Sequence, residues 1–279
     1  MILLKLKASG DAVALLQELL NEFGHNLIVD GKFQNATDLA VREFQKKNNL
    51  VSDGVVYTKT WTRLLNNAPV DLTQMETRFL TEQNLIDTAR QLGIELAVLK
   101  AVNEVESSGR GFNVDGTVKI LFEGHVFWQQ LKERGVNPAG FVSGAEDVLY
   151  NKWTKKFYLG GKAEYRRLNK AIVLWNNHTA LQVAGTEAAY AAASWGLFQI
   201  MGYHFKALGF KEIVEFVGEM KESEGDQLRL FARYIEVNKL AGYLKKKQWA
   251  EFALRYNGAG YKANKYDEKL ARAYQKHRQ

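Results

Sequence analysis

Apolar residues recur every three or four positions in several segments of this chain, the spacing that places them on one face of an α-helix. The first stripe comprises Val13, Leu16, Leu20 and Phe23. Later stripes comprise Ile94, Ala97, Val98, Ala101, Val102 and Val105; Leu228, Phe231 and Ile235; and Trp249, Phe252, Ala253 and Tyr256. Strand-like alternation is scarce, although residues 117–124 are consistent with a short extended piece. The pattern therefore predicts a mainly α fold.

The first 65 residues contain an internal repeat. Segment 27–41 aligns with segment 50–64, so that Asp30-Gly31 coincides with Asp53-Gly54 and Thr37 with Thr60. We expect each copy to form a tight Asp-Gly turn, a short extended piece and a helix that starts near the threonine. Together with the preceding amphipathic helix, the two copies predict a small three-helix domain with one core.

The length of 279 residues indicates about two domains. The polar segment 66–75 holds one of only two prolines and is the best candidate for a linker. We predict a first domain over residues 1–68, a linker over 69–75 and a larger helical domain over 76–279.

Composition excludes several kinds of protein. The chain has no cysteine, which rules out disulfides, thiolate zinc sites and cysteine nucleophiles. Its histidines are widely scattered, so we predict no metal site, and no nucleotide-binding fingerprint is present. No window has the ~18 apolar residues of a membrane span. The amino terminus lacks the apolar stretch of a secretory signal, so we expect synthesis in the cytoplasm without a signal peptide.

The positive charge is concentrated at the carboxyl end. The formal net charge of the chain is +7, and residues 240–279 alone carry +7. Such a surface attracts nucleic acid, membrane phosphates or an anionic wall polymer, or is simply a solvated helical face. We expect no nucleic-acid partner and consider anionic outer-membrane lipid a candidate partner of residues 240–279. We expect the chain to be a monomer.

Glu106 is the first candidate for chemistry, because it ends the apolar stripe at 94–105 and precedes a glycine-rich turn. A carboxyl beside an apolar wall is costly to ionise, so its pKa rises and it can protonate a departing glycosidic oxygen. Gly109 and Gly111 would let the backbone pass close to a substrate. The alternative is an ordinary glutamate at the end of a helix.

Two later segments offer groups that suit a sugar. Segment 194–201 looks helix-like and places Ser194 and Gln199 in an apolar run, where the amide needs hydrogen-bond partners. Tyr256 and Asn257 lie at a predicted helix end, where an aromatic ring and an amide can stack on and bind a pyranose. Tyr256 is equally suited to the core.

The repeat resembles the peptidoglycan-binding module of cell-wall hydrolases. The resemblance covers nearly all of residues 1–68 and includes Asp30, Gly31, Asp53 and Gly54, which we take as marker residues of that module. Gln34 and Tyr57 depart from it, because the family usually has glycine at those positions. The resemblance implies that peptidoglycan is a partner of this domain.

The order of the later motifs resembles the goose-type lysozyme and lytic transglycosylase superfamily: Glu106-Ser107, then the Gly-Leu-x-Gln at 196–199, then Tyr256-Asn257. More closely, residues 76–279 are similar to the N-acetylmuramidase domain of modular phage endolysins. That resemblance implies a lysozyme-like helical fold without a cofactor, and cleavage of the β-1,4 bond between N-acetylmuramic acid and N-acetylglucosamine. It also implies that Glu106, rather than Glu104, is the general acid, and that a holin lets the enzyme reach the wall.

Glu123 is the candidate second carboxylate. It could activate water if it lay ~6.5–9.5 Å from Glu106, as inverting hydrolases require; alternatively, it forms a structural pair with His125. Two other functions stay open from the sequence. A lytic transglycosylase would share the acid but form anhydro-muramic ends, and a wall-binding structural protein would have an inert lysozyme-like domain.

Overall fold

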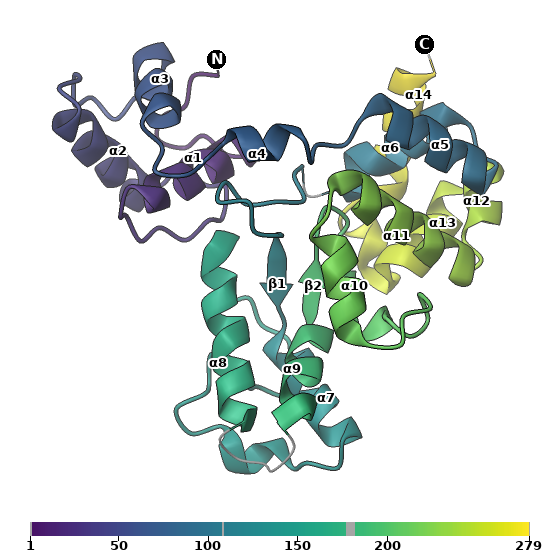
Figure 1. Ribbon diagram of the computed structural model, residues 1–279. Coiled ribbons are helices and arrows are strands. Elements are labelled where there is room, and N and C mark those ends of the chain that lie inside the picture. Colours follow the sequence, from purple (N-terminus) through teal and green to yellow (C-terminus); the bar gives the residue numbers. More distant parts are fainter. Residues whose placement is uncertain (1, 108, 177–181, 279) are drawn as a thin grey trace. The chain divides into compact units, whose positions relative to one another are not determined.

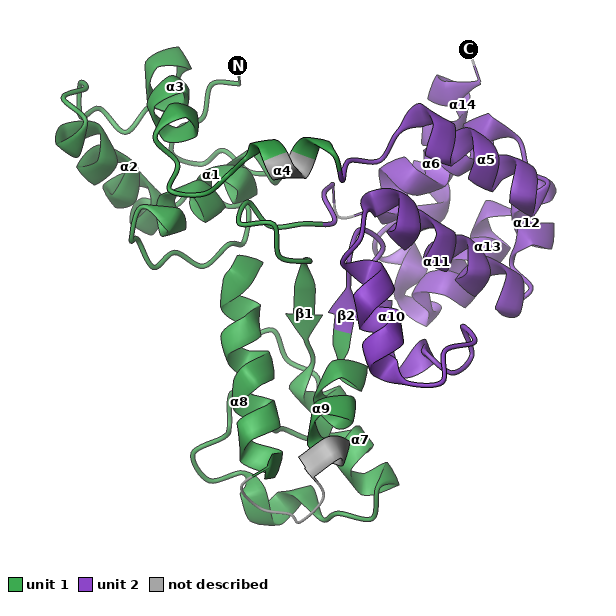
Figure 2. Ribbon diagram, in the orientation of Figure 1, with its two compact units in different colours: residues 1–77, 112–193 green, residues 78–111, 194–279 purple. Residues whose placement is uncertain are grey.

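The computed structural model describes residues 2–107, 109–176 and 182–278, which form two compact units (Figures 1 and 2). Unit 1 comprises residues 1–77 and 112–193, and unit 2 comprises residues 78–111 and 194–279. Each unit is therefore built from two separate stretches of the chain. Helices dominate both, as the apolar spacing predicts. No helix among the described residues is long and apolar enough to cross a membrane.

In the part of the chain that the structure describes, unit 1 contains the α-helices α1 to α4 and α7 to α9 and the strand β1 (Figure 1). The elements are α1 (Asp11–Glu22), α2 (Asn35–Lys47), α3 (Thr58–Asn66), α4 (Thr73–Glu76), β1 (Ile120–Phe122), α7 (Gly124–Glu133), α8 (Glu164–Asn176) and α9 (Gln182–Ala191). Strand β1 lies in the segment for which the sequence predicts an extended piece, and α4 lies at the end of the predicted linker.

The first three helices enclose one small core, as predicted. Its buried side chains include Val13, Leu16, Leu20, Phe33, Val41, Phe44, Val56 and Leu64. Helix α2 begins two residues before Thr37, and α3 begins two residues before Thr60, so the two copies of the repeat start their helices at the same position. The repeat in the sequence is thus a repeat in the structure.

A buried glutamine closes the turn of the first copy. The Gln17 amide nitrogen donates to the Asp30 carboxylate (3.0 Å) and to the Thr37 hydroxyl (3.2 Å), and its oxygen accepts from the Gly31 backbone N–H (2.9 Å). Gly31 has a φ of 68°, which glycine adopts without strain. Gln17 is 1% exposed, so its polar groups need these partners.

The second copy repeats this arrangement with Gln45. Its amide nitrogen donates to Asp53 (3.0 Å) and to Thr60 (3.2 Å), and its oxygen accepts from the Gly54 N–H (3.0 Å). Gly54 has a φ of 73°. The Asp-Gly pairs that mark the module in the sequence therefore hold its two turns together, and the two glutamines are the partners that make this possible.

The later part of unit 1 is positioned by a buried ion pair on α8. Glu164 and Arg167 lie 2.8 Å apart at their charged atoms and are 0% and 2% exposed. Glu164 accepts from the Leu159 N–H (2.6 Å), and Arg167 donates to the Phe122 carbonyl (2.8 Å). These bonds compensate for burying the charges and fix the backbone at Phe122, immediately before Glu123.

The module also contacts residues 112–163 within unit 1. The Glu18 carboxylate accepts from the Val114 N–H (3.1 Å), and the Val29 N–H donates to the Leu159 carbonyl (2.8 Å). Val114 is buried together with the core of α1 to α3. The first domain is thus packed against a later part of the chain.

Unit 2 consists of helices and one small hairpin. The elements are α5 (Glu82–Leu92), α6 (Leu96–Glu106), β2 (Ala193–Trp195, whose first residue belongs to unit 1), β3 (Ile200–Met201), α10 (Ile213–Met220), α11 (Glu224–Val237), α12 (Ala241–Lys245), α13 (Trp249–Asn257) and α14 (Tyr266–His277). Strands β2 and β3 pair antiparallel, with Ser194 opposite Met201 and Trp195 opposite Ile200.

Helix α6 is held between neighbours in unit 2. It packs against α14 and α5, and its residues Val98, Ala101 and Val102 are buried (Figure 1). Helix α5 starts with a capping box at Thr81 and Asn84 and precedes α6 by only a short turn. The apolar stripe of the sequence is therefore the buried face of α6, and Glu106 is the last residue of that helix.

Candidate active site

Glu106 lies at the carboxyl end of α6, in contact with the end of α13. The Asn257 amide nitrogen donates to Glu106 Oε2 over 2.9 Å. The other carboxyl oxygen, Oε1, is buried and has no hydrogen-bond partner among the described residues. The amide oxygen of Asn257 is in the same situation. Two buried polar oxygens without partners in one site are costly, and a bound ligand that offers hydrogen-bonding groups would relieve that cost.

Burial raises the pKa of Glu106 to about 7. The hydrogen bond from Asn257 and the positive charge of Lys269 act in the opposite direction but are the smaller effects. The carboxyl also lies at a helix C-terminus, whose partial negative charge disfavours ionisation. Near neutral pH this group is therefore present in both forms, which suits a group that must give up a proton.

Glu104, the other acid of α6, is in a different environment. It is exposed and accepts from Lys276 and contacts the His277 ring, each over 2.8 Å. The hydrogen bond from Lys276 lowers the pKa of Glu104 below its ordinary value. It is therefore a charged surface group, and the environment favours Glu106 over Glu104 as a proton donor.

Tyr256 lies in an aromatic cluster. Its ring stacks on Phe252 (centroids 5.5 Å apart) and meets Phe231 and Tyr234 edge-on. Burial, and then the charge of Glu106, raise the pKa of Tyr256 well above its ordinary value, so its hydroxyl stays protonated. The ring of Tyr256 is half-buried against these aromatic neighbours.

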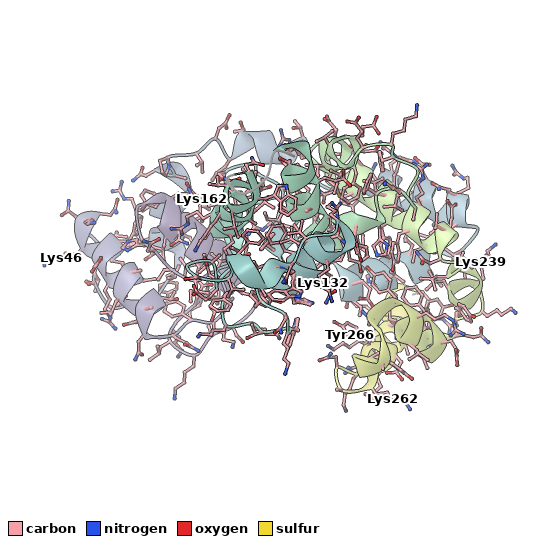
Figure 3. The ribbon with its side chains drawn as sticks, turned by 90° about the horizontal axis from the view of Figure 1, so that it is seen from below. Lys46, Lys132, Lys162, Lys239, Lys262 and Tyr266 are labelled. Carbon is pink, nitrogen blue, oxygen red and sulfur yellow. The ribbon has the colours of Figure 1, made fainter. Side chains whose placement is uncertain are left out.

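Tyr266 lies at the start of α14 (Figure 3). It is close enough to Glu106 to feel its charge, which the sequence pattern does not reveal. Burial and the charge of Glu106 raise the pKa of Tyr266. Helix α14 thus brings both Tyr266 and Lys269 within electrostatic reach of the acid. A motif scan could not find them, because nothing in the local sequence links them to residue 106.

Ser194 and Gln199 lie in a hairpin, so the prediction of a helix-like run over 194–201 is wrong. Gly196 has a φ of 71° and Gln199 a φ of 50°, and such left-handed residues turn the chain back between β2 and β3. Gln199 accepts from the Ser194 hydroxyl (2.8 Å) and donates to the Gly196 carbonyl (2.7 Å). The hydrogen-bond partners of the Gln199 amide, for which the sequence suggested a sugar, are thus supplied within the hairpin.

Helix α11 fixes the loop that follows Glu106. Glu224 is 5% exposed and accepts from the Gly111 N–H (2.7 Å) and the Leu80 N–H (2.8 Å). Gln227, one turn later, is 1% exposed and accepts from the Leu197 N–H in the hairpin (2.7 Å). A Cβ at Gly111 would lie 2.0 Å from the Gln227 amide oxygen. Gly111 therefore makes room for Gln227, a partner that the sequence pattern does not reveal.

Glu123, in unit 1, immediately precedes α7. The Tyr158 hydroxyl lies 2.7 Å from both of its carboxyl oxygens, and His125 Nδ1 lies 3.3 Å from Oε2. The Glu123 side chain is 13% exposed. The contact with His125 anticipated from the sequence is present, and Tyr158 is a partner that the sequence did not reveal, because 35 residues separate the two.

The basic residues near the carboxyl end are partly paired. Lys247 bonds to Glu95, Arg255 to Glu251 and Lys276 to Glu104. Lys262 is exposed and extends from the surface of unit 2 (Figure 3).

In the part of the chain that the structure describes, which omits His178, no group of three or more histidine or acidic side chains could hold a metal ion.

The fold and the environment of Glu106 agree with a match to a protein family. The N-acetylmuramidase family model matches residues 95–278, and the chain belongs to that family. A peptidoglycan-binding domain model matches residues 9–64. The chain is therefore a modular peptidoglycan hydrolase, with its wall-binding domain at the amino end.

A solved structure supports the same conclusion over the whole chain. The endolysin of Burkholderia phage AP3 is 37% identical, with a TM-score of 0.64, and the match covers 99% of each chain. No curated protein gives a significant match. The predicted combination of a three-helix wall-binding domain with a larger lysozyme-like helical domain is confirmed.

Proposed function

We propose that this protein is an endolysin in which Glu106 protonates the β-1,4 glycosidic oxygen between N-acetylmuramic acid and N-acetylglucosamine. The observation that carries the proposal is a buried carboxyl with a pKa of about 7 and one unpaired oxygen. A general acid must hold its proton until the substrate arrives and then present it to the leaving oxygen.

In this mechanism the proton leaves Glu106 Oε1 for the bridging oxygen while the bond to the anomeric carbon breaks. The oxocarbenium-like sugar then takes up water, which loses a proton to a base. Asn257 holds Oε2 through its N–H (2.9 Å), which orients the acid and stabilises the carboxylate that forms. The unpaired Asn257 oxygen is placed to accept the N–H of an acetamido group.

We propose Glu123 as the group that activates the water. Tyr158 donates to it and His125 lies beside it, so the carboxylate is held in one orientation. Among the other candidates, Gln199 and Tyr256 would hold the glycan together with Asn257. Ser194 would shape the hairpin through its bond to Gln199.

Mass spectrometry of purified peptidoglycan digested by the protein tests this proposal. Reducing N-acetylmuramic acid ends are expected, because water is the acceptor; anhydro-muramic ends would mean a transglycosylase. Glu106→Gln should fold and lose lytic activity, whereas Glu104→Gln should keep it. Lysis by Glu106→Gln would end the assignment.

The remaining parts of the proposal concern organisation and partners. We propose a wall-binding domain over residues 1–68, a linker over 69–75 and a catalytic domain over 76–279, in a monomer. From the resemblance to modular phage endolysins, we propose synthesis in the host cytoplasm and access to the wall through a holin.

We also propose that residues 240–279 contact anionic outer-membrane lipid. Neutralising Lys245, Lys246, Lys247, Lys276 and Arg278 should then reduce lysis of intact cells but not digestion of purified wall. Equal activity on intact cells would contradict the lipid contact.

A further inference from the structure

An exposed tryptophan lies in the loop that leads to Tyr158. The Trp153 side chain is 60% exposed, an unusual position for the largest apolar side chain in a soluble domain. The loop is nevertheless anchored, because the Tyr158 N–H donates to the Lys155 carbonyl (3.1 Å). The Tyr158 hydroxyl in turn contacts the Glu123 carboxylate over 2.7 Å. The loop that carries the indole is thus tied to the proposed base, and much of the ring remains accessible.

The same loop carries a concentration of positive charge. Lys155 Nζ lies 5.6 Å from the centroid of the Trp153 ring, and Lys156 Nζ lies 5.2 Å from that of Phe157. Lys152 is also exposed, and residues 151–160 contain no acid. A ligand that stacks on Trp153 would therefore place its substituents next to cations.

We propose that Trp153 is a stacking platform for a sugar of the peptidoglycan strand, and that Lys155 binds a carboxylate carried by that strand. Peptidoglycan fits both features, since its sugars present flat C–H faces, its stem peptides carry carboxylates, and its lactyl groups carry one wherever no peptide is attached. The inference rests on the proposed role of Glu123 in the glycan site and adds a binding subsite beside it.

A lipid headgroup would also suit a tryptophan flanked by lysines, but the anchored loop favours the glycan. A membrane anchor needs an apolar side chain that is free to enter the interface. Here the loop is closed by the bond from the Tyr158 N–H to the Lys155 carbonyl and is held at Glu123 by the Tyr158 hydroxyl, so Trp153 stays near the proposed base. A sugar platform requires such a fixed position relative to the proposed base.

The test is the kinetics of cleavage of amidase-treated glycan strands, which keep the lactyl carboxylate. For Trp153→Ala we expect KM to rise about tenfold with kcat nearly unchanged, since a large aromatic contact is lost away from the reacting atoms. Trp153→Phe keeps an aromatic face and should recover most of that loss. Lys155→Gln should raise KM at low salt, and the difference should vanish in ~1 M NaCl. Val173→Ala, at an exposed apolar position of α8, is the matched control.

Binding of uncleaved strands to the Glu106→Gln protein, with and without Trp153→Ala, separates this inference from the proposed reaction. If the wild type gives no reducing ends but Trp153→Ala still weakens strand binding, the reaction is wrong and the platform stands. An unchanged KM and unchanged strand binding in Trp153→Ala would overturn the platform. The platform would also be overturned if Trp153→Ala lost affinity for phosphatidylglycerol vesicles but not for glycan strands, because the surface would then be a membrane contact.

Discussion

Ionisation of Glu106 is expected to destabilise the folded state, because the carboxyl is buried. Its folded pKa of about 7 lies above its ordinary value of 4.5. The resulting contribution to stability is fully present below pH 4.5 and is lost as the pH rises through 7. Glu106→Gln removes this titration. The unfolding free energy of the variant minus that of the wild type should therefore increase by about 3 kcal/mol from pH 4.5 to pH 8. Urea unfolding at both pH values measures this, and an equal difference at the two would contradict the raised pKa.

Lys269 offers a second test at the residue scale. Its positive charge lowers the pKa of Glu106, although it is exposed and makes no hydrogen bond to the acid. Lys269→Gln should therefore raise that pKa and move the alkaline limb of the kcat profile to higher pH. Lys269→Arg keeps the charge and should leave the limb in place. A limb that does not move in Lys269→Gln would mean that another group limits the rate.

At the scale of the elements, the loop after α6 depends on a close approach between Gly111 and α11. The Gln227 amide cannot move aside easily, because it is buried and bonded to Leu197 and Met220. Gly111→Ala should thus cost about 1–3 kcal/mol of unfolding free energy and reduce kcat as the loop shifts. Gly218→Ala, in α10 with no atom within 4 Å of the added Cβ, should instead stabilise slightly. Thermal unfolding of both variants checks this, and equal melting temperatures would contradict the role of Gly111.

What the sequence could predict differs from one element to the next. Apolar spacing located α6 and α13 together with the residues that end them, Glu106 and Asn257, since a buried helical face leaves a periodic trace. The sequence pattern did not predict the hairpin after Ala193, because a short apolar run has the same appearance in a strand and in a helix. Other contacts could not be predicted for another reason. Tyr158 reaches Glu123, and Gln227 reaches the loop after Glu106, through tertiary contacts, which local sequence does not encode.

At the scale of the whole molecule, the wall-binding domain is more than a tethered module. Glu18 and Val29 bond to the backbone of later residues in unit 1, and Val114 completes the module's core. Removing residues 1–68 would uncover Val114 and leave the Leu159 carbonyl without its partner. The truncated chain should therefore unfold at a lower temperature than the intact protein, even though its acid is untouched.

A glycine pair in the full-length chain tests this packing without a deletion. Gly160 and Gly258 share a backbone conformation, with φ/ψ of 69°/167° and 79°/−174°, so alanine imposes a similar backbone strain at each, about 1–3 kcal/mol. Only at Gly160 would the new Cβ also meet the module, at 2.2 Å from the Val29 carbonyl oxygen; at Gly258 it meets nothing within 4 Å. Gly160→Ala should therefore lower the unfolding temperature more than Gly258→Ala does, and residues 1–68 should become easier to release by proteolysis. Equal losses in the two variants would mean that the module contributes nothing to the stability of the rest of unit 1.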